Sequence, residues 1–327
     1  MHAPRYLAAP VLGLLMLAAA PAQAQTQTAY PARPIHLIVN GAPGSLPDLF
    51  ARPIAEKMRT SLGQAVVIDN RPGAGGLLAM TNLKNSAADG YTLAVVTNAH
   101  AVWNQYLFSK LPYDPQADLQ AVGPIAVIPM VLTASPALPT GSLKELIALA
   151  KARPGVLNYA SSSTGSPPHV LFEMFKLQTG ADILHVPFKS GPDALNSTIS
   201  DRTQLYLAGS ALIEPQVKDG RLKALAVNTR ARLASLPGVP TFAEQGYPGL
   251  EDTVWLGIVA QAGVPSDIVQ KLNREIAKAV QAEDMKKLYD AHGSVVYTAS
   301  PEEFAARIKA DHALWGPVIK KANISLD

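Results

Sequence analysis

Apolar runs that end in loops of small residues, each followed by a helix pattern, recur along this chain. The first covers residues 35–52 (IHLIVNGAPGSLPDLFAR), where an apolar strand leads into a helix that begins near Leu46. Ser45 and Asp48 have the S-x-x-D spacing of a capping box, which marks a helix start. Unpaired N–H groups and the helix dipole would make this loop a pocket for an anion. An ordinary strand-to-helix turn has the same pattern, so the loop alone does not decide between the two.

The same alternation repeats in two blocks and predicts an α/β fold. Further strand patterns occupy residues 65–69, 92–97, 158–160, 183–186, 203–207 and 224–228, and helix patterns occupy residues 77–84, 142–153 and 167–179. Small-residue loops precede two of these helices, at residues 70–76 (NRPGAGG) and 161–166 (SSSTGS). Strands that alternate with helices indicate mostly parallel sheets, whose ligands bind beyond the carboxyl ends of the strands.

Two extended segments, residues 119–134 and 254–260, predict crossings between two lobes. The first is apolar but is broken by Gly123, Pro124 and Pro129, which fits a crossing better than a core strand. The helices after the second segment are expected to pack back on the first block. The predicted domains are therefore lobe 1 (residues 30–126 and 252–327) and lobe 2 (residues 127–251), with hinges at residues 125–130 and 252–256.

The first 24 residues have the pattern of a signal peptide. Arg5 precedes an apolar run at residues 7–20, and Ala22-Gln23-Ala24 is a small-residue cleavage site. The run is too short to span a bilayer. The chain contains no cysteine, which excludes a disulfide framework and the lipid-carrying cysteine of a lipoprotein. We therefore expect an exported protein without a membrane tether.

Composition and charge limit the classes of partner that we expect for this protein. The 327 residues are 48% hydrophobic and 16% charged, which suits about two lobes around a large core. The chain has 28 Lys and Arg residues against 25 Asp and Glu residues, and removal of Arg5 with the signal peptide leaves 27 − 25 = +2. Nucleic-acid binding requires a clustered basic surface, so nucleic acid is not an expected partner.

The sequence carries no signature of an enzyme. No serine has the G-x-S-x-G setting, and the chain has neither a G-K pair nor an H-E-x-x-H motif. His100 and His169 lie near predicted loops, but neither has a second ligand at metal-binding spacing. We therefore expect no cofactor and no metal. Two alternatives stay open: a secreted hydrolase that uses a serine of the loop at residues 161–166, and the effector domain of a transcription regulator, which would need a DNA-binding segment.

From Tyr30 onward the chain resembles the Bug/TctC family, the extracytoplasmic solute-binding proteins of tripartite tricarboxylate transporters. The resemblance rests on motifs along nearly the whole mature chain: Tyr30-Pro31, Arg33-Pro34, Pro43-Gly44, Asp48, Ala51-Arg52, residues 70–76, Asp89-Gly90-Tyr91, Asn158-Tyr159, Gly165-Ser166-Pro167, His185-Val186-Pro187, Lys189, Asp219-Gly220-Arg221 and residues 237–241 (PGVPT). It implies a type II periplasmic-binding-protein fold that closes around one small solute, often a carboxylate, without catalysis. The expected protein is a periplasmic monomer that serves a membrane transporter of this type.

The resemblance also implies a set of ligand-binding residues. In lobe 1 they are Ala42, Gly44, Ser45, Asp48, Gly75, Thr97 and Asn98, and in lobe 2 they are Ser162, Thr164, Gly165, Ser166 and Lys189. Asp48 fits a purely structural cap slightly better than a ligand contact. Lys189 fits a solvated surface lysine as well as it fits a cleft residue.

Two positions depart from the family pattern, and both are expected in the cleft. Ser45 stands where family members usually have a second glycine, so it adds a hydroxyl group. Ala208 stands where they commonly carry an aspartate. Without that carboxylate, the cleft neither attracts an ammonium group nor repels an additional negative charge. The predicted solute is therefore anionic or neutral.

Overall fold

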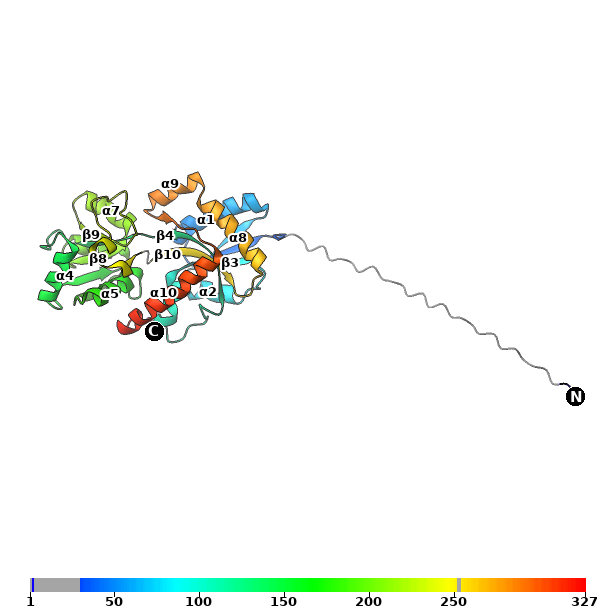
Figure 1. Ribbon diagram of the computed structural model, residues 1–327, viewed down its shortest axis with the longest axis horizontal. Coiled ribbons are helices and arrows are strands. Elements are labelled where there is room, and N and C mark those ends of the chain that lie inside the picture. Colours follow the sequence, from blue (N-terminus) through cyan, green and yellow to red (C-terminus); the bar gives the residue numbers. More distant parts are fainter. Residues whose placement is uncertain (1, 3–29, 252–253) are drawn as a thin grey trace.

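Two β-sheets, each covered by helices, make up the computed structural model, which describes residues 2, 30–251 and 254–327. The two sheets belong to two lobes that lie side by side (Figure 1). Apart from His2, the predicted signal peptide lies outside the described residues, as do Asp252 and Thr253 of the predicted second hinge. The α/β fold predicted from the alternation of strands and helices is confirmed.

The first sheet has six strands in the order β11-β4-β10-β3-β1-β2. These strands are β1 (Ile35–Val39), β2 (Val66–Asn70), β3 (Thr92–Thr97), β4 (Leu119–Val127), β10 (Trp255–Gln261) and β11 (Val295–Val296). The helices of this lobe are α1 (Leu46–Leu62), α2 (Leu77–Lys84), α3 (Asn104–Leu107), α8 (Ser266–Val280), α9 (Glu283–Ala291) and α10 (Pro301–Lys321), with a 3₁₀ turn η1 (Ala74–Gly76) and a π-helical turn η2 (Ala99–Trp103).

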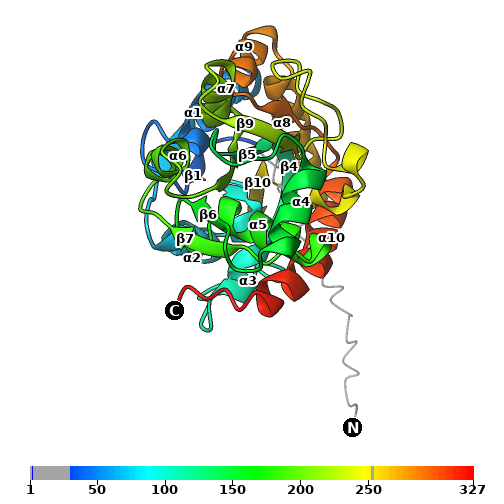
Figure 2. The same ribbon diagram turned by 90° about the vertical axis from the view of Figure 1, so that its left-hand side faces the viewer.

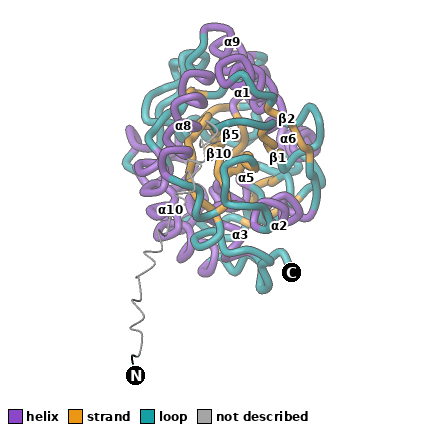
Figure 3. The backbone as a smooth tube through the Cα atoms, turned by 90° about the vertical axis from the view of Figure 1, so that its right-hand side faces the viewer, coloured by secondary structure: helices purple, strands orange, loops and turns teal. Residues whose placement is uncertain are grey.

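The second sheet has five strands in the order β7-β6-β8-β5-β9. They are β5 (Met130–Ala134), β6 (Asn158–Ser161), β7 (Leu184–Pro187), β8 (Leu205–Gly209) and β9 (Lys223–Val227). The helices are α4 (Leu143–Ala152), α5 (Pro167–Thr179), α6 (Gly191–Ile199) and α7 (Ser210–Lys218), with 3₁₀ turns η3 (Ala243–Gln245) and η4 (Pro248–Leu250). Figure 3, which looks along the long axis of the molecule, shows helices (purple) around the strands (orange).

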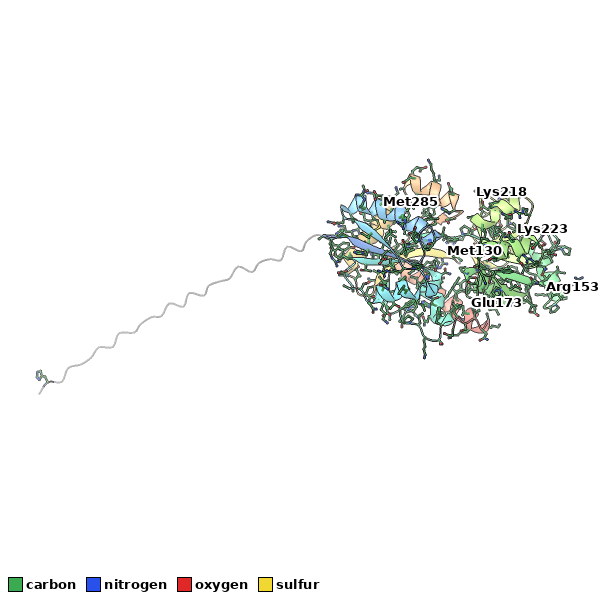
Figure 4. All side chains as sticks on the ribbon, turned by 180° about the vertical axis from the view of Figure 1, so that it is seen from behind. Met130, Arg153, Glu173, Lys218, Lys223 and Met285 are labelled. Carbon is green, nitrogen blue, oxygen red and sulfur yellow. The ribbon has the colours of Figure 1, made fainter. Side chains whose placement is uncertain are left out.

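The strands that pass between the lobes run antiparallel to their neighbours. β10 is antiparallel to β3 and β4, and β5 is antiparallel to β8 and β9, whereas β1, β2 and β3 are parallel. β4 and β5 are joined at Ile128 and Pro129, and Met130 at the start of β5 lies at the junction of the lobes (Figure 4). Apart from these strands and the short β11, which is antiparallel to β4, the strands of each sheet run parallel, so their carboxyl ends meet at one edge.

Both extended segments connect the two sheets, but the prediction that residues 119–134 suit a crossing better than a core strand was wrong. Residues 119–134 form two strands, β4 and β5, and residues 255–261 form β10 in the middle of the first sheet. Pro124 is tolerated because it lies opposite Gly257, where the register between β4 and β10 shifts. The absence of a side chain at Gly123 leaves room for Asn273, whose amide nitrogen would lie 2.8 Å from a Cβ atom there.

The last helix, α10, packs on the first lobe and its end contacts the second lobe. The predicted capping box of α10 is present, because Ser300 accepts from the backbone N–H of Glu303 and Glu303 accepts from that of Ser300. Trp315 on α10 packs edge to face on Trp103, with ring centroids 5.4 Å apart. The end of α10 lies against α5 of lobe 2, and the segment after it runs beside α3 (Figure 2).

Candidate functional site

The loop between β1 and α1 is held by a buried carboxylate. Helix α1 begins at Leu46 as predicted, and Gly44 has a left-handed backbone with φ of 81°. The N–H of Gly44 donates to Oδ2 of Asp48 over 2.8 Å. The predicted capping bond from Ser45 is not formed: its hydroxyl oxygen is buried without a hydrogen-bond partner among the described residues. A Cβ atom on Gly41 would lie 2.1 Å from this oxygen, so the hydroxyl faces the start of the loop.

Asp48 is fully engaged in structural bonds. Besides the N–H of Gly44, it accepts from Nε of Arg52 over 2.8 Å and from Nδ2 of Asn70 over 2.9 Å. The same Asn70 nitrogen donates to the carbonyl of Gly41 over 2.9 Å. Burial raises the pKa of the Asp48 carboxyl, but the hydrogen bonds from Arg52, Gly44 and Asn70 outweigh it and lower this pKa below its usual value. These contacts indicate that Asp48 has a structural role, in which it fastens the β1–α1 loop to the end of β2.

The loop between β6 and α5 has the same shape and a different anchor. Gly165 has φ of 72°, and its N–H donates over 3.0 Å to Nδ1 of His169, four residues later. The hydroxyl of Ser166 donates over 2.6 Å to the carbonyl of Ser163 and closes the loop. Because Nδ1 of His169 accepts an N–H, the proton of this neutral ring is on Nε2.

A buried polar network supports this second loop from below. The ring of His169 stacks on that of His185 at a centroid distance of 3.7 Å. Burial lowers the pKa of His169 to about 3 and that of His185 to about 4, so both rings are neutral at pH 7. Tyr159 donates to Glu173 over 2.6 Å, and Lys176 pairs with the same carboxylate over 2.8 Å.

Ser161, at the end of β6, is bound inside this network. Its hydroxyl donates to the carbonyl of Ser163 over 3.0 Å, and its oxygen lies 2.6 Å from Nε2 of His185. Since the serine proton is directed to a carbonyl, Nε2 of His185 is the donor to the serine oxygen. The side chain is also fully buried. Ser161 is therefore not placed as a nucleophile with His185 as its base.

A cavity of about 390 Å³ opens between the two loops, within the size range of small-molecule sites. Its lining comes from both lobes: Asn40, Pro47, Gly73, Gly75, Gly76, Thr97, Ala99, His100, Asn104 and Leu107 from lobe 1, Ser163, Thr164, Gly165, Ser166 and Pro167 from lobe 2, and Leu326 from the segment after α10. None of these lining residues is an acid, a lysine or an arginine. An anion here would be bound by N–H, hydroxyl and amide groups.

The cavity brings together five of the predicted ligand-binding residues: Gly75, Thr97, Thr164, Gly165 and Ser166. The other predicted residues do not line it. Ala42, Gly44 and Ser45 are in the β1–α1 loop, and Ser162 is half-buried in the β6–α5 loop. Asn98 is fully buried at the start of η2. Lys189 is exposed after β7 and does not line the cavity.

Ala208 lies in a core, not on the cavity wall. It is buried on β8 in an apolar cluster of lobe 2 that also contains Val131 and Ile213. The sequence position at the end of a strand did not reveal this, because the face of β8 that a residue occupies depends on the packing of α6 and α7. An aspartate here would be surrounded by apolar side chains, so its effect on a ligand would be mixed with a cost in stability.

Sequence reasoning missed Asn40, His100, Asn104, Leu107 and Leu326. His100 is buried, which lowers its pKa to about 4, and its Nδ1 accepts from the N–H of Thr97 over 3.2 Å. The ring occupies the space left by Gly76, where a Cβ atom would lie 2.2 Å from it. Asn40 also lines the cavity, and its Oδ1 is buried without a partner among the described residues. Asn104 donates to the carbonyl of Gly75 over 3.2 Å.

The two helix N-termini beside the cavity do not offer the same number of donors. The first three N–H groups of a helix lack intrahelical partners. In α1 these positions are Leu46, Pro47 and Asp48, whereas in α5 they are Pro167, Pro168 and His169. Proline has no N–H, so α5 presents only one donor in its first turn. The β6–α5 loop therefore offers fewer main-chain donors to a ligand than the β1–α1 loop does.

Two lobes joined by crossing strands, with a cavity between loops at the carboxyl ends of parallel strands, define a solute-binding protein of the periplasmic type. No described helix combines the length and apolar character that a bilayer crossing requires, and no group of three His, Asp or Glu residues in the described part could hold a metal ion.

The chain belongs to the family described as tripartite tricarboxylate transporter family receptor, whose model matches residues 50–324. It is 34% identical to Protein BugT of Bordetella pertussis over an alignment of 327 residues, and this alignment covers 100% of both chains. Two solved structures are also similar. "R. palustris Rpa4515 with adipate" has 33% identity and a TM-score of 0.75, and covers 91% of this chain and 100% of its own. "MatC (Rpa3494) from Rhodopseudomonas palustris with bound malate" has 28% identity and a TM-score of 0.71, and the match covers 89% of this chain and 100% of that one.

These matches confirm the Bug/TctC resemblance and the solute-binding role. The family consists of receptors that bind a substrate for transport.

Proposed function

We propose that this protein captures a small organic carboxylate between its lobes in the periplasm and delivers it, as a monomer, to the membrane subunits of a tripartite tricarboxylate transporter. The observation that carries the proposal is the cavity of about 390 Å³ between two loops, whose walls bear hydroxyl, amide and main-chain groups and no acid. Helices α1 and α5 both begin beside it, and helix N-termini favour a negative charge. Relatives solved with adipate and with malate support the carboxylate class.

The ligand is expected between Thr164, Gly165 and Ser166 on one side and the loop of Gly44 and Ser45 with Thr97 and Gly75 on the other. Thr164 carries a hydroxyl group that can donate to a carboxylate oxygen, whereas the proton of Ser166 is already donated to the carbonyl of Ser163. Leu46 and Asp48 add main-chain N–H groups from the first turn of α1. Ala42, Asn98, Ser162 and Lys189 would act as neighbours of this site.

A thermal-shift screen tests the carboxylate class directly. Probes are adipate, malate, hexanoate, benzoate and glutamate, with the uncharged full amides of the first four acids as controls. A ligand at ~100 times its dissociation constant stabilises the folded state by about 2.7 kcal/mol. We expect the acids to raise the melting temperature and their amides not to. Stabilisation by the amides alone would contradict the proposal.

Binding is expected to close the lobes around hinges at residues 125–130 and 252–256. The first hinge contains the short link of Ile128 and Pro129 between β4 and β5. Closure would make the particle more compact. Small-angle scattering should therefore give a smaller radius of gyration with a saturating ligand than without it. Equal radii would count against hinged closure, and the same measurement reports whether the particle has the mass of a monomer.

No catalysis is expected at the cavity. The alternative of a hydrolase that uses a serine of residues 161–166 is disfavoured, because Ser161 and Ser166 both donate their hydroxyl protons to the carbonyl of Ser163. A panel of acetate and butyrate esters should show no turnover above a buffer control. Turnover that a Ser162→Ala variant abolishes would favour the hydrolase.

A further inference from the structure

The segment after α10 leaves lobe 1 and ends in the wall of the cavity. The N–H of Leu326 donates to the carbonyl of Leu107 over 2.8 Å. The carboxylate of Asp327 accepts from the N–H of Ser109 over 2.9 and 3.1 Å. In Figure 2 this red segment crosses below α3 after the end of α10. These bonds fix the segment to the chain that follows α3, so the position of Leu326 is set by backbone contacts.

The side chain of Leu326 lies over the ligand loop of the other lobe. A Cβ atom built on Gly165 would be 2.9 Å from one methyl group of Leu326 and 3.1 Å from the other. Gly165 is also the residue whose N–H is held by His169. Leu326 is therefore a contact between the lobes at the centre of the β6–α5 loop.

Apolar and polar groups are both present in the cavity wall. Leu326 joins Leu107, Pro47 and Pro167 as apolar lining, while Thr97, Asn104, Thr164 and Ser166 supply polar atoms. A ligand that places a carboxylate on the polar groups would put the rest of its structure against the apolar ones. A solute with an alkyl or aryl portion gains from this contact, whereas a hydroxylated acid loses hydration there.

We propose that Leu326 determines specificity, as the apolar wall that selects carboxylates with an alkyl or aryl portion over hydroxylated acids. This inference rests on the proposed function, since it concerns the portion of the ligand beyond the carboxylate. It assigns a binding role to a segment that contributes no strand or loop of the two sheets.

Calorimetry with two probes, hexanoate and malate, tests the inference on the full mature chain. The variant is Leu326→Ser, and the matched control is Leu314→Ser on α10, where the leucine is 40% exposed and outside the cavity lining. Loss of apolar contact should weaken hexanoate about tenfold and change malate less than about twofold. Leu314→Ser should change neither, and Leu326→Met should restore hexanoate binding because methionine supplies similar apolar area.

The outcomes separate this inference from the proposed function. If the wild type binds neither hexanoate, malate nor the other acids of the screen, the carboxylate class is wrong and the inference fails with it. If the wild type binds acids and Leu326→Ser weakens hexanoate and malate equally, Leu326 only connects the lobes and the specificity role is overturned. No change for either probe would also overturn it, while the carboxylate function would stand.

Discussion

The β1–α1 loop and the β6–α5 loop share a backbone geometry but are held by different chemistry. Gly44 and Gly165 have φ of 81° and 72°, and the N-cap serines after them have ψ of 159° and 160°. In both loops the glycine N–H is accepted by the side chain four residues later. The acceptor is the charged carboxylate of Asp48 in lobe 1 and the neutral ring of His169 in lobe 2.

The surroundings of Asp48 and His169 explain why one loop is held by a charged group and the other by a neutral ring. Asp48 has Arg52 and Asn70 beside it at the lobe surface, and these donors keep its charge stable. His169 lies in a buried stack with His185 and near Tyr159, where the donors Tyr159 and Lys176 are already bound to Glu173. One loop shape can therefore be held by an ion or by a neutral ring, and the two should respond differently to mutation and to acid.

The largest expected effect is loss of binding on filling the space at Gly165. Gly165→Val adds backbone strain at a positive φ and overlaps Leu326, so we expect affinity for the best acid of the screen to fall more than about 100-fold. Gly44→Val adds the same backbone strain, but its side chain would meet no neighbouring atom, so we expect the affinity to fall only about tenfold. Calorimetry measures both.

Gly220→Val is the control for strain alone, because Gly220 has φ of 68°, open surroundings and a place outside the cavity lining. It should bind normally. Unchanged affinity in Gly165→Val would contradict a site formed by both loops.

Removal of the charged anchor should destabilise the fold more than removal of a surface ion pair. Asp48→Ala leaves the N–H of Gly44 without its acceptor and removes one of the two acceptors of the Asn70 amide, and we expect a loss of about 2 to 3 kcal/mol in the free energy of unfolding. Asp69→Ala, which removes the surface pair with Arg71, should cost less than about 0.5 kcal/mol. Urea unfolding at pH 7 compares the two. Equal losses would show that Asp48 does not anchor the loop.

A fall in pH should weaken the anchor of lobe 2, His169, before it weakens the anchor of lobe 1, Asp48. The pKa of His169 in the folded state is about 3, below its ordinary 6.5, so its contribution is complete above pH 6.5 and is lost as the pH falls toward 3. At pH 5 this loss is about 2 kcal/mol. The pKa of Asp48 is lowered from 3.8, so its contribution declines only below about pH 4.

Unfolding free energies at pH 7, 6 and 5 test this difference. His169→Asn keeps an acceptor for Gly165 but does not titrate, so it should reduce the fall in unfolding free energy between pH 6 and pH 5 by about 1 kcal/mol. Asp48→Asn should leave the slope in this range unchanged. An unchanged slope in His169→Asn would mean that the ring is not neutral in the folded protein.

Local signals in the sequence were sufficient to predict the elements around the site. Helices α1, α2 and α5 begin where predicted, because small residues and capping or proline signals precede them within one turn. These helix starts needed only the order of residues in one β-loop-α unit. The five predicted residues that line the cavity came instead from the family resemblance.

Contacts between distant parts of the chain could not be predicted in this way. Gly123 and Pro124 suggested a break, but the register shift opposite Gly257 accommodates them in a strand. Leu326 reaches Gly165 from more than a hundred residues away, and no local pattern marks it. The neutral role of His169 depends on the stack with His185, which forms only in the folded lobe.

The smallest effect should separate the two N-cap serines. Ser45 makes no capping bond, and its hydroxyl is buried without a partner among the described residues, so Ser45→Gly should cost only a few tenths of a kcal/mol. Ser166 donates to the carbonyl of Ser163, and Ser166→Gly should cost about 1 kcal/mol and also weaken acid binding. Both replacements place glycine at the same backbone angles, so the difference between them isolates the hydroxyl group. Urea unfolding gives the two stabilities and calorimetry the two affinities. If Ser45→Gly weakens binding as much as Ser166→Gly does, the hydroxyl of Ser45 turns toward the ligand in the bound state, and the two loops would be equivalent in chemistry as well as in shape.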